Sequence, residues 1–247
     1  MKNKKAVITV SIIALLLMVA SVIASTDNAM EDPQVGVAEA EVAGQLTPNG
    51  DRVVAKVNGE NILAKDYLGS VEKSRYGTEY LKANVGKDTF TAYDEKWLKM
   101  RDDYSPEEIG LGCQILDAAE YGEAKKIGLD ISLEEARSFI KKNRQIAEED
   151  GFQLSEPYQE IINEIGEDAY WNEFAARAAQ KNNSIGALQQ NIIEQADSVE
   201  EGYQLLRDYQ TKLIKEAQVE IIDEELLANL SVEKAKEYII SFTNLTM

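Results

Sequence analysis

The pattern of hydrophobic and polar positions divides the chain into three parts. Residues 6–24 are apolar and uncharged, and three lysines precede them. Residues 26–51 are rich in Ala, Glu, Gly and Val and have no sustained period, which predicts a flexible acidic linker. From residue 52 onward, apolar residues recur mostly at the three- and four-residue spacing of amphipathic helices. This order predicts a signal or anchor segment, a linker and a mainly helical folded part.

The first 25 residues have the charge-then-apolar order of a secretory signal. The apolar run is also close to the roughly 20 residues that span a bilayer, so it either is cleaved near Ala24 or stays as an anchor. Both alternatives place the folded part outside the cytoplasm, secreted or held at the outer face of a bacterial cytoplasmic membrane by residues 6–24. No cysteine lies just after the run, so a lipid anchor is not expected.

Two segments far apart in the sequence have β character. Residues 52–63 form a β-rich run that is interrupted by Asn58-Gly59, the dipeptide typical of tight hairpin turns. Residues 218–223 alternate in part and predict a short strand. Because a lone strand needs a partner, we expect it to pair with residues 52–57 and to close the helical part into one unit.

Three helix starts are explicit, since a serine is followed three residues later by a glutamate at Ser105, Ser132 and Ser198. Gly128 is a plausible stop for the first of these helices, and the first two are expected to form a helical hairpin. Further helices are expected in residues 158–165, 170–178, 203–217 and, as one or two amphipathic helices, 224–247.

The charge balance excludes several kinds of partner. The chain carries a net charge of −18, and without the three lysines of the first 24 residues 23 basic residues remain against 44 acidic ones. Nucleic acid is therefore not expected as a partner, and contact with a membrane is expected only through the N-terminal segment. No stretch has the Asp-x-Asp-x-Asp-Gly spacing of a calcium loop. A solvated acidic surface is the simpler interpretation.

The inventory of reactive side chains argues against an enzyme. The chain has no histidine, and its single cysteine, Cys113, can form no internal disulfide and has no histidine to serve as its base. Neighbouring carboxylates such as Glu107 and Glu108, or Asp102 and Asp103, do not face each other on a helix. The sequence therefore predicts no catalytic residues, no cofactor and no metal site.

Three segments carry a resemblance to a known family. Residues 53–62, Val-Val-Ala-Lys-Val-Asn-Gly-Glu-Asn-Ile, resemble the opening of the SurA N-terminal-like domain of exported chaperones and foldases of the SurA and PrsA type. Residues 116–135 resemble the family's long helix, its Ala-Lys-Lys-x-Gly end and the capped helix that follows. Residues 209–222 are similar to the C-terminal return of PrsA-like proteins, where a late strand joins the first. The resemblance implies a domain at 52–223, with 224–247 as a C-terminal helical extension.

The chain departs from this family in three ways. A parvulin isomerase domain often lies between the N-terminal helices and the return, whereas residues 152–215 here have a helical pattern. Parvulin sites also use histidines, so isomerase activity is not expected. The lipid-anchor cysteine of many PrsA-like proteins is missing, and Ala64 stands where the family often has a capping Thr or Ser.

The resemblance implies an exported chaperone-like protein that binds unfolded or partly folded exported polypeptides in a groove between its helices. Trp97, Tyr170, Trp171 and Phe174 are candidates for an apolar client-binding lining, although aromatic residues at helical spacing also suit a core. The alternative is a membrane-tethered adaptor at the cell envelope that binds a single folded partner. A chaperone needs an open groove with apolar lining, and an adaptor needs one flat apolar patch, for example on residues 224–247.

Overall fold

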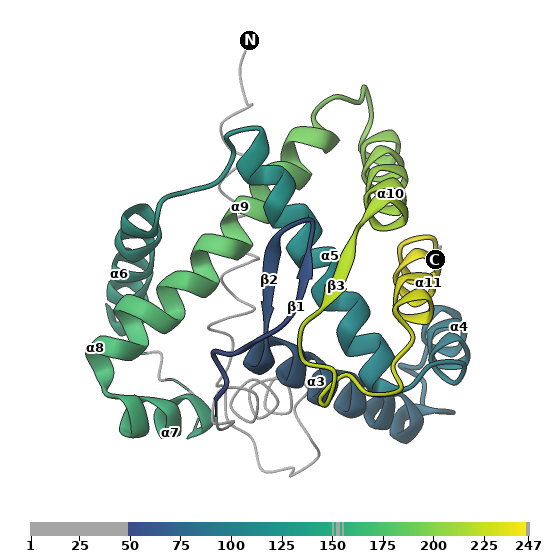
Figure 1. Ribbon diagram of the computed structural model, residues 1–247, viewed down its shortest axis with the longest axis horizontal. Helices are drawn as coiled ribbons and strands as arrows, with labels where there is room; N and C mark the ends of the chain where they lie inside the picture. The colour runs from purple at the N-terminus through teal and green to yellow at the C-terminus, as the bar shows by residue number, and fades with distance from the viewer. Residues whose placement is uncertain (1–48, 150, 152–153, 155, 246–247) are drawn as a thin grey trace.

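The computed structural model describes residues 49–149, 151, 154 and 156–245 (Figure 1). The predicted signal or anchor segment, and the predicted linker up to residue 48, lie outside the described residues. Across the described ranges, no helix is both long enough and apolar enough to cross a membrane.

The described chain is mainly helical and has a small antiparallel sheet, as the sequence predicts. In chain order, the elements are β1 (Val53–Val57), β2 (Glu60–Leu63), α3 (Ala64–Asn84), α4 (Ala92–Arg101), α5 (Pro106–Lys126), α6 (Leu133–Glu149), α7 (Glu156–Ile165), α8 (Glu167–Ala169), the π-helix η1 (Tyr170–Ala175), α9 (Ala176–Ile193), α10 (Val199–Glu216), β3 (Val219–Ile221) and α11 (Val232–Thr243). The interval expected to be helical in place of a parvulin domain consists of α7 to α10.

The sheet has the strand order β2-β1-β3, and both pairs are antiparallel. Asn58 and Gly59 connect β1 to β2 with φ angles of 51° and 91°, values that suit the tight turn predicted from this dipeptide. On the other side of β1, Val57 lies opposite Val219. The predicted pairing of the late strand with the first one is therefore confirmed.

The three predicted cap serines begin helices as expected. Each accepts a hydrogen bond from the backbone N–H of the glutamate three residues later, at 3.1 Å for Ser105 and Ser132 and at 3.2 Å for Ser198. These bonds satisfy a donor that the first turn of a helix leaves free. The sequence thus places the starts of α5, α6 and α10 correctly.

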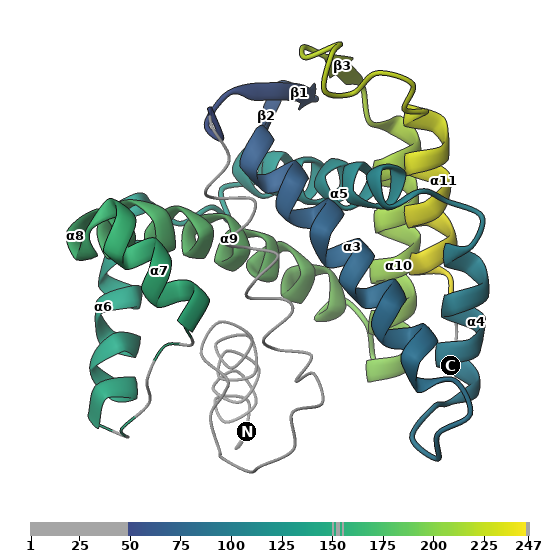
Figure 2. The same cartoon turned by 90° about the horizontal axis from the view of Figure 1, so that it is seen from below.

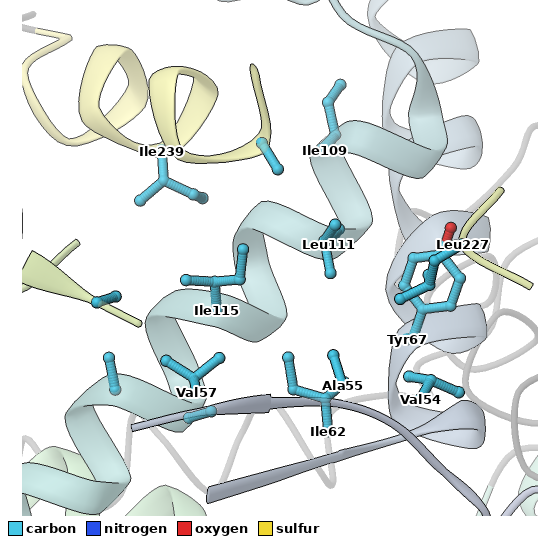
Figure 3. Packing of buried hydrophobic residues seen from close by; sticks show 14 of the residues in the cluster. Val54, Ala55, Val57, Ile62, Tyr67, Ile109, Leu111, Ile115, Leu227 and Ile239 are labelled. Atoms are coloured by element: carbon cyan, nitrogen blue, oxygen red, sulfur yellow. The ribbon is translucent and has the colours of Figure 1, made fainter. Parts of the chain in front are cut away.

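Helix α5 is the centre of a unit that we call the body, made of the sheet with α3, α4, α5, α10 and α11. Ile115 and Leu111 on α5 are fully buried and face Val57 and Ala55 of the sheet (Figure 3). On another side, α11 lies against the α5 backbone. A Cβ at Gly112 would lie 2.4 Å from the carbonyl oxygen of Ala235, so only glycine fits there. Burial on several sides makes α5 the main contributor to the core.

The C-terminal residues pack into the same core. Of the one or two helices expected in residues 224–247, the described residues form one, α11, and turns precede it. Leu227, Tyr238 and Ile239 belong to the core cluster of the body. The apolar side of this segment is therefore in contact with the body.

A second, smaller core holds together a unit that we call the arm, made of α6, α7, α8, η1 and the first turns of α9. Its buried side chains include Ile140, Ile161 and Tyr170. Figure 2 shows these helices on the opposite side of the molecule from α10 and α11.

The predicted helical hairpin of α5 and α6 is wrong. Helix α6 packs against α9 and η1 instead, through the face that carries Ala136 and Ile140. The sides of α5 are covered by α3, α11, α9 and the sheet, so no side remains for α6. Ile127, the residue after the end of α5 at Lys126, is exposed.

Candidate functional site

A groove with a volume of about 1220 Å³ lies between the body and the arm. Elements β2, α3 and α5 of the body line one side of it, and α6, η1 and α9 line the other side. Residues near the start of α10 also contribute to the lining. Strand β2, which follows directly from the Asn58-Gly59 turn, is the strand of the hairpin that lies at the groove.

The arm supplies the most apolar part of the lining, which includes Phe139, Ile140, Tyr158 and Phe174. Phe139 and Ile140 come from α6, where apolar residues recur at helical spacing. Phe174 comes from the π-helix η1, whose wider turn is a feature often found at functional sites. These side chains also pack in the core of the arm, so the groove wall and that core share residues.

The structure separates the four aromatic residues predicted to bind clients. Tyr170 and Phe174 line the groove, with ring centroids 5.3 Å apart. Trp171 lies in the arm outside the described lining, beside Arg144, whose guanidinium is 5.0 Å from the ring centroid. Trp97 lies on α4 in the body and contacts the ring of Phe242. Phe174 is partly buried and lies at the groove wall, whereas Tyr170 is buried in the core of the arm and the two tryptophans lie outside the described lining.

Polar groups cross the groove where α9 approaches α5. The ammonium of Lys181 lies 3.5 Å from a carboxylate oxygen of Asp117, and it also lies 3.4 Å from the side-chain oxygen of Gln114. Gln114 donates in turn to the hydroxyl of Ser70 on α3 at 2.8 Å. Burial raises the pKa of Asp66, although the charge of Lys181 acts in the opposite direction. These contacts connect the arm side of the groove to the body side.

The groove lacks the acidic excess of the chain as a whole. The basic residues of its described lining are Lys65, Lys73, Lys125, Arg177 and Lys181, and the acidic residues are Glu60, Asp66, Asp117 and Glu135. Over the whole chain, 44 acidic residues stand against 26 basic ones. Most of the basic lining residues have carboxylate partners in Asp51, Glu60, Glu173 and Asp117. The local charge is therefore close to balanced, and selection of a strongly basic ligand is not expected inside the groove.

Glu120 lies at the junction of α5, α9 and α10 behind the groove wall. Its side chain is buried, and its carboxylate accepts hydrogen bonds from Gln189 at 3.1 Å and from Gln210 at 2.9 Å. Burial raises the pKa of Glu120 to about 7. Gln189 also lines the groove, and the cluster connects α9 and α10 to α5 behind the groove wall. Sequence reasoning missed it, since one glutamate among 44 acidic residues gives no local signal.

Cys113, Glu107 and Glu108, the reactive side chains considered in the sequence, lie outside the described lining of the groove. Burial raises the pKa of the Cys113 thiol to about 12, so the thiolate nucleophile is disfavoured. Glu108 caps its own helix, and Glu107 pairs with Arg75. Within the described ranges, no group of three or more Cys, Asp or Glu side chains is placed to hold a metal ion.

Comparison with known proteins gives no match, since no family model fits the chain and no curated protein or solved structure is similar to it. The likeness to the SurA N-terminal-like domain therefore stays a prediction from the residues quoted above.

Proposed function

We propose that this protein is an exported, chaperone-like protein that binds unfolded or partly folded segments of other exported polypeptides, without isomerase activity. The observation that carries the proposal is the groove between body and arm. It has a volume of about 1220 Å³ and an apolar lining from α6, η1 and α9. Concave sites lined by apolar side chains with a few polar groups are typical binding sites.

The lining explains how such binding would remain reversible. Phe174 and Tyr203 present apolar surface to the groove, and Tyr203 is about half exposed. An unfolded client loses conformational freedom when it binds, and this cost lowers the affinity. Contacts of this kind are therefore short-lived. The net charge of −18 keeps the loaded protein soluble through repulsion between copies.

The single-partner adaptor has less support from the fold. Its expected docking segment, residues 224–247, places Leu227, Tyr238 and Ile239 in the core of the body. Phe242 is the large hydrophobic side chain of α11 that is exposed, and its ring contacts Trp97 and Tyr238. This leaves little apolar surface on α11 for a flat interface.

The test is suppression of aggregation by the purified protein, with a chemically unfolded exported protein as client. An unrelated acidic protein of similar net charge is the control. We expect suppression near a stoichiometric ratio for this protein only. Equal suppression by both proteins would assign the effect to charge and contradict the proposal.

A pair of variants on α10 connects suppression to the groove. Tyr203→Ser removes an exposed side chain that lines the groove, and Leu205→Ser removes an exposed side chain outside the described lining. Both substitutions are at the surface and should leave unfolding free energies within about 0.5 kcal/mol of the parent. Only Tyr203→Ser should weaken suppression, and equal weakening by both would place binding elsewhere.

A further inference from the structure

We infer that the groove holds a client segment as an added β-strand, paired through its main chain with the outer edge of β2. This inference rests on the proposed function and names how the same groove recognises a polypeptide. It starts from the sheet order, in which β2 is a terminal strand. Gly59, Glu60, Asn61 and Leu63, at or within this strand, line the groove.

The register identifies which backbone groups of β2 have no strand partner among the described residues. The carbonyl of Val54 accepts from the N–H of Ile222 at 3.0 Å, and the N–H of Asn58 donates to the carbonyl of Gln218 at 2.9 Å. Because bonding in an antiparallel sheet alternates along a strand, the intervening residues Ala55 and Val57 bond to β2.

The partners of these two residues on β2 are Ile62 and Glu60. The N–H and the C=O of Asn61 therefore point away from β1, and so does the N–H of Leu63. Across the described ranges no strand pairs with this side of β2. A free strand edge is a template for another extended chain, and proteins usually cover or blunt it.

The groove provides a surface beside this edge for the side chains of an added strand. Ala118 and Tyr121 of α5 belong to the same lining as Asn61 and Leu63. The ammonium of Lys125 pairs with Glu60, so the charge next to the strand is already balanced. Recognition by strand addition takes its affinity from main-chain hydrogen bonds and its selectivity from neighbouring pockets.

Charge separates a client segment from two other occupants. A second copy of this chain also carries a net charge of −18, so edge-to-edge pairing of two copies works against repulsion. Residues 26–48 of this chain include five acidic residues and no basic one. The acidic exterior repels such a segment, and the nearly balanced charge of the groove does not attract it. An uncharged or weakly basic extended segment fits best.

Peptide binding to the full chain tests the inference directly. The probe is a capped decapeptide, Lys-(Thr-Val)4-Lys, compared with the same peptide N-methylated at every threonine and valine. Methylation leaves the side chains in place but blocks strand pairing. Since main-chain hydrogen bonds supply the affinity, we expect the unmodified peptide to bind at least about tenfold more tightly. Equal affinities would overturn the inference.

Two substitutions at Asn61 provide a matched pair on the protein. Asn61→Pro removes the outward N–H and keeps the bonds from β2 to β1, because proline is tolerated where the N–H of an edge strand faces out. Asn61→Ala removes only the side chain. We expect Asn61→Pro to lose about tenfold in affinity for the unmodified peptide and Asn61→Ala to keep it. Equal affinities of the two variants would also overturn the inference.

Amide hydrogen exchange distinguishes the possible occupants. In the free protein, the amides of Asn61 and Leu63 should exchange faster than those of Glu60 and Ile62, and the peptide should slow only the first two. Slow exchange at Asn61 and Leu63 before peptide is added would assign the edge to another part of this chain or to a second copy, and would contradict the inference.

If suppression of aggregation depends on Tyr203 while Asn61→Pro changes nothing, the proposed function stands and strand addition fails. If aggregation is not suppressed, the proposed function fails first.

Discussion

The body and the arm are both helical, but their buried apolar cores differ in size. Among the described residues, the core cluster of the body has eighteen buried members, drawn from the sheet, four helices and the segments that flank β3, whereas that of the arm has four. Both units also carry ion pairs between exposed side chains, such as Arg75 with Glu72 in the body and Arg144 with Glu148 in the arm. Exposed pairs of this kind contribute about 0 to 1 kcal/mol each.

This difference teaches how the groove is built. One wall belongs to a unit with a large core, and the other wall belongs to a unit with a small one. Units with few buried apolar contacts open locally at lower free energy than a large core. The arm is therefore expected to adjust to different clients while the body stays fixed, and the following predictions test that contrast.

The largest expected effect is in the body. Ile115→Ala deletes a fully buried side chain of α5 and should lower the free energy of unfolding by about 3 kcal/mol, because it leaves a cavity in the core. Urea unfolding followed by circular dichroism measures this loss. The exposed Ile222→Ala is the control and should change stability by less than about 0.5 kcal/mol. A loss of less than 1 kcal/mol at Ile115 would contradict the central place given to α5.

The corresponding change in the arm should remain local. Ile161→Ala removes a buried side chain from the smaller core and should lower the free energy of opening the arm by about 2 kcal/mol. Residue-resolved hydrogen exchange should show faster exchange in α6, α7 and η1, with α3 and α5 unchanged. Equal acceleration in both units would mean that arm and body unfold together.

The junction of the two walls should respond to pH through Glu120. Its folded pKa is raised from 4.5 to about 7, so the native state keeps a proton that the unfolded chain releases. The contribution of Glu120 therefore destabilises the fold progressively as pH rises from about 4.5 to about 7, and the penalty is complete above that range. Glu120→Gln should remove this dependence and gain up to about 3 kcal/mol at pH 8 relative to the parent, because each unit of pKa shift corresponds to about 1.4 kcal/mol.

The measurement for Glu120 is the difference in unfolding free energy between parent and variant at several pH values. Taking the difference cancels the titration of the other carboxylates. A difference that does not change between pH 4.5 and pH 8 would show that the buried carboxyl titrates normally.

The last prediction compares two aromatic residues of η1. Their substitution should have the smallest effect on stability and the most specific effect on function. Phe174 and Trp171 both pack partly against the core of the arm, but only Phe174 is in the described lining of the groove. Phe174→Ala and Trp171→Ala should lower arm stability similarly. Only Phe174→Ala should also weaken client binding, by about tenfold, as expected for loss of an aromatic anchor. Binding isotherms with the unfolded client measure this, and equal weakening would remove η1 from the site.

Much of the fold could be predicted from local patterns. The Asn58-Gly59 turn, the cap serines and the helical spacing each depend on a few neighbouring residues, and the structure confirms all three. The pairing of β3 with β1 was also predictable, because a single strand left few possible partners. The α5–α6 hairpin failed because adjacency in sequence does not tell which faces of a helix are already covered.

The candidate site was predicted less well. Four aromatic residues were selected by type and spacing, yet Trp97 and Trp171 lie outside the described lining. Apolar periodicity shows which face of a helix is buried, but not which unit covers it. The remaining parts of the groove, such as Lys181, Asp117 and the edge of β2, come from segments that lie side by side only in the folded chain.

By itself, the sequence determined the mainly helical character, the starts of α5, α6 and α10, the β1–β2 hairpin with its late partner strand, and the acidic charge. These properties follow from local propensity, capping and composition, which act over a few residues. Only the tertiary structure decided that α6 joins the arm, that Glu120 is buried between three helices, and that β2 lines a groove. Those outcomes depend on which apolar faces bury each other, and that choice is made by packing across the whole chain.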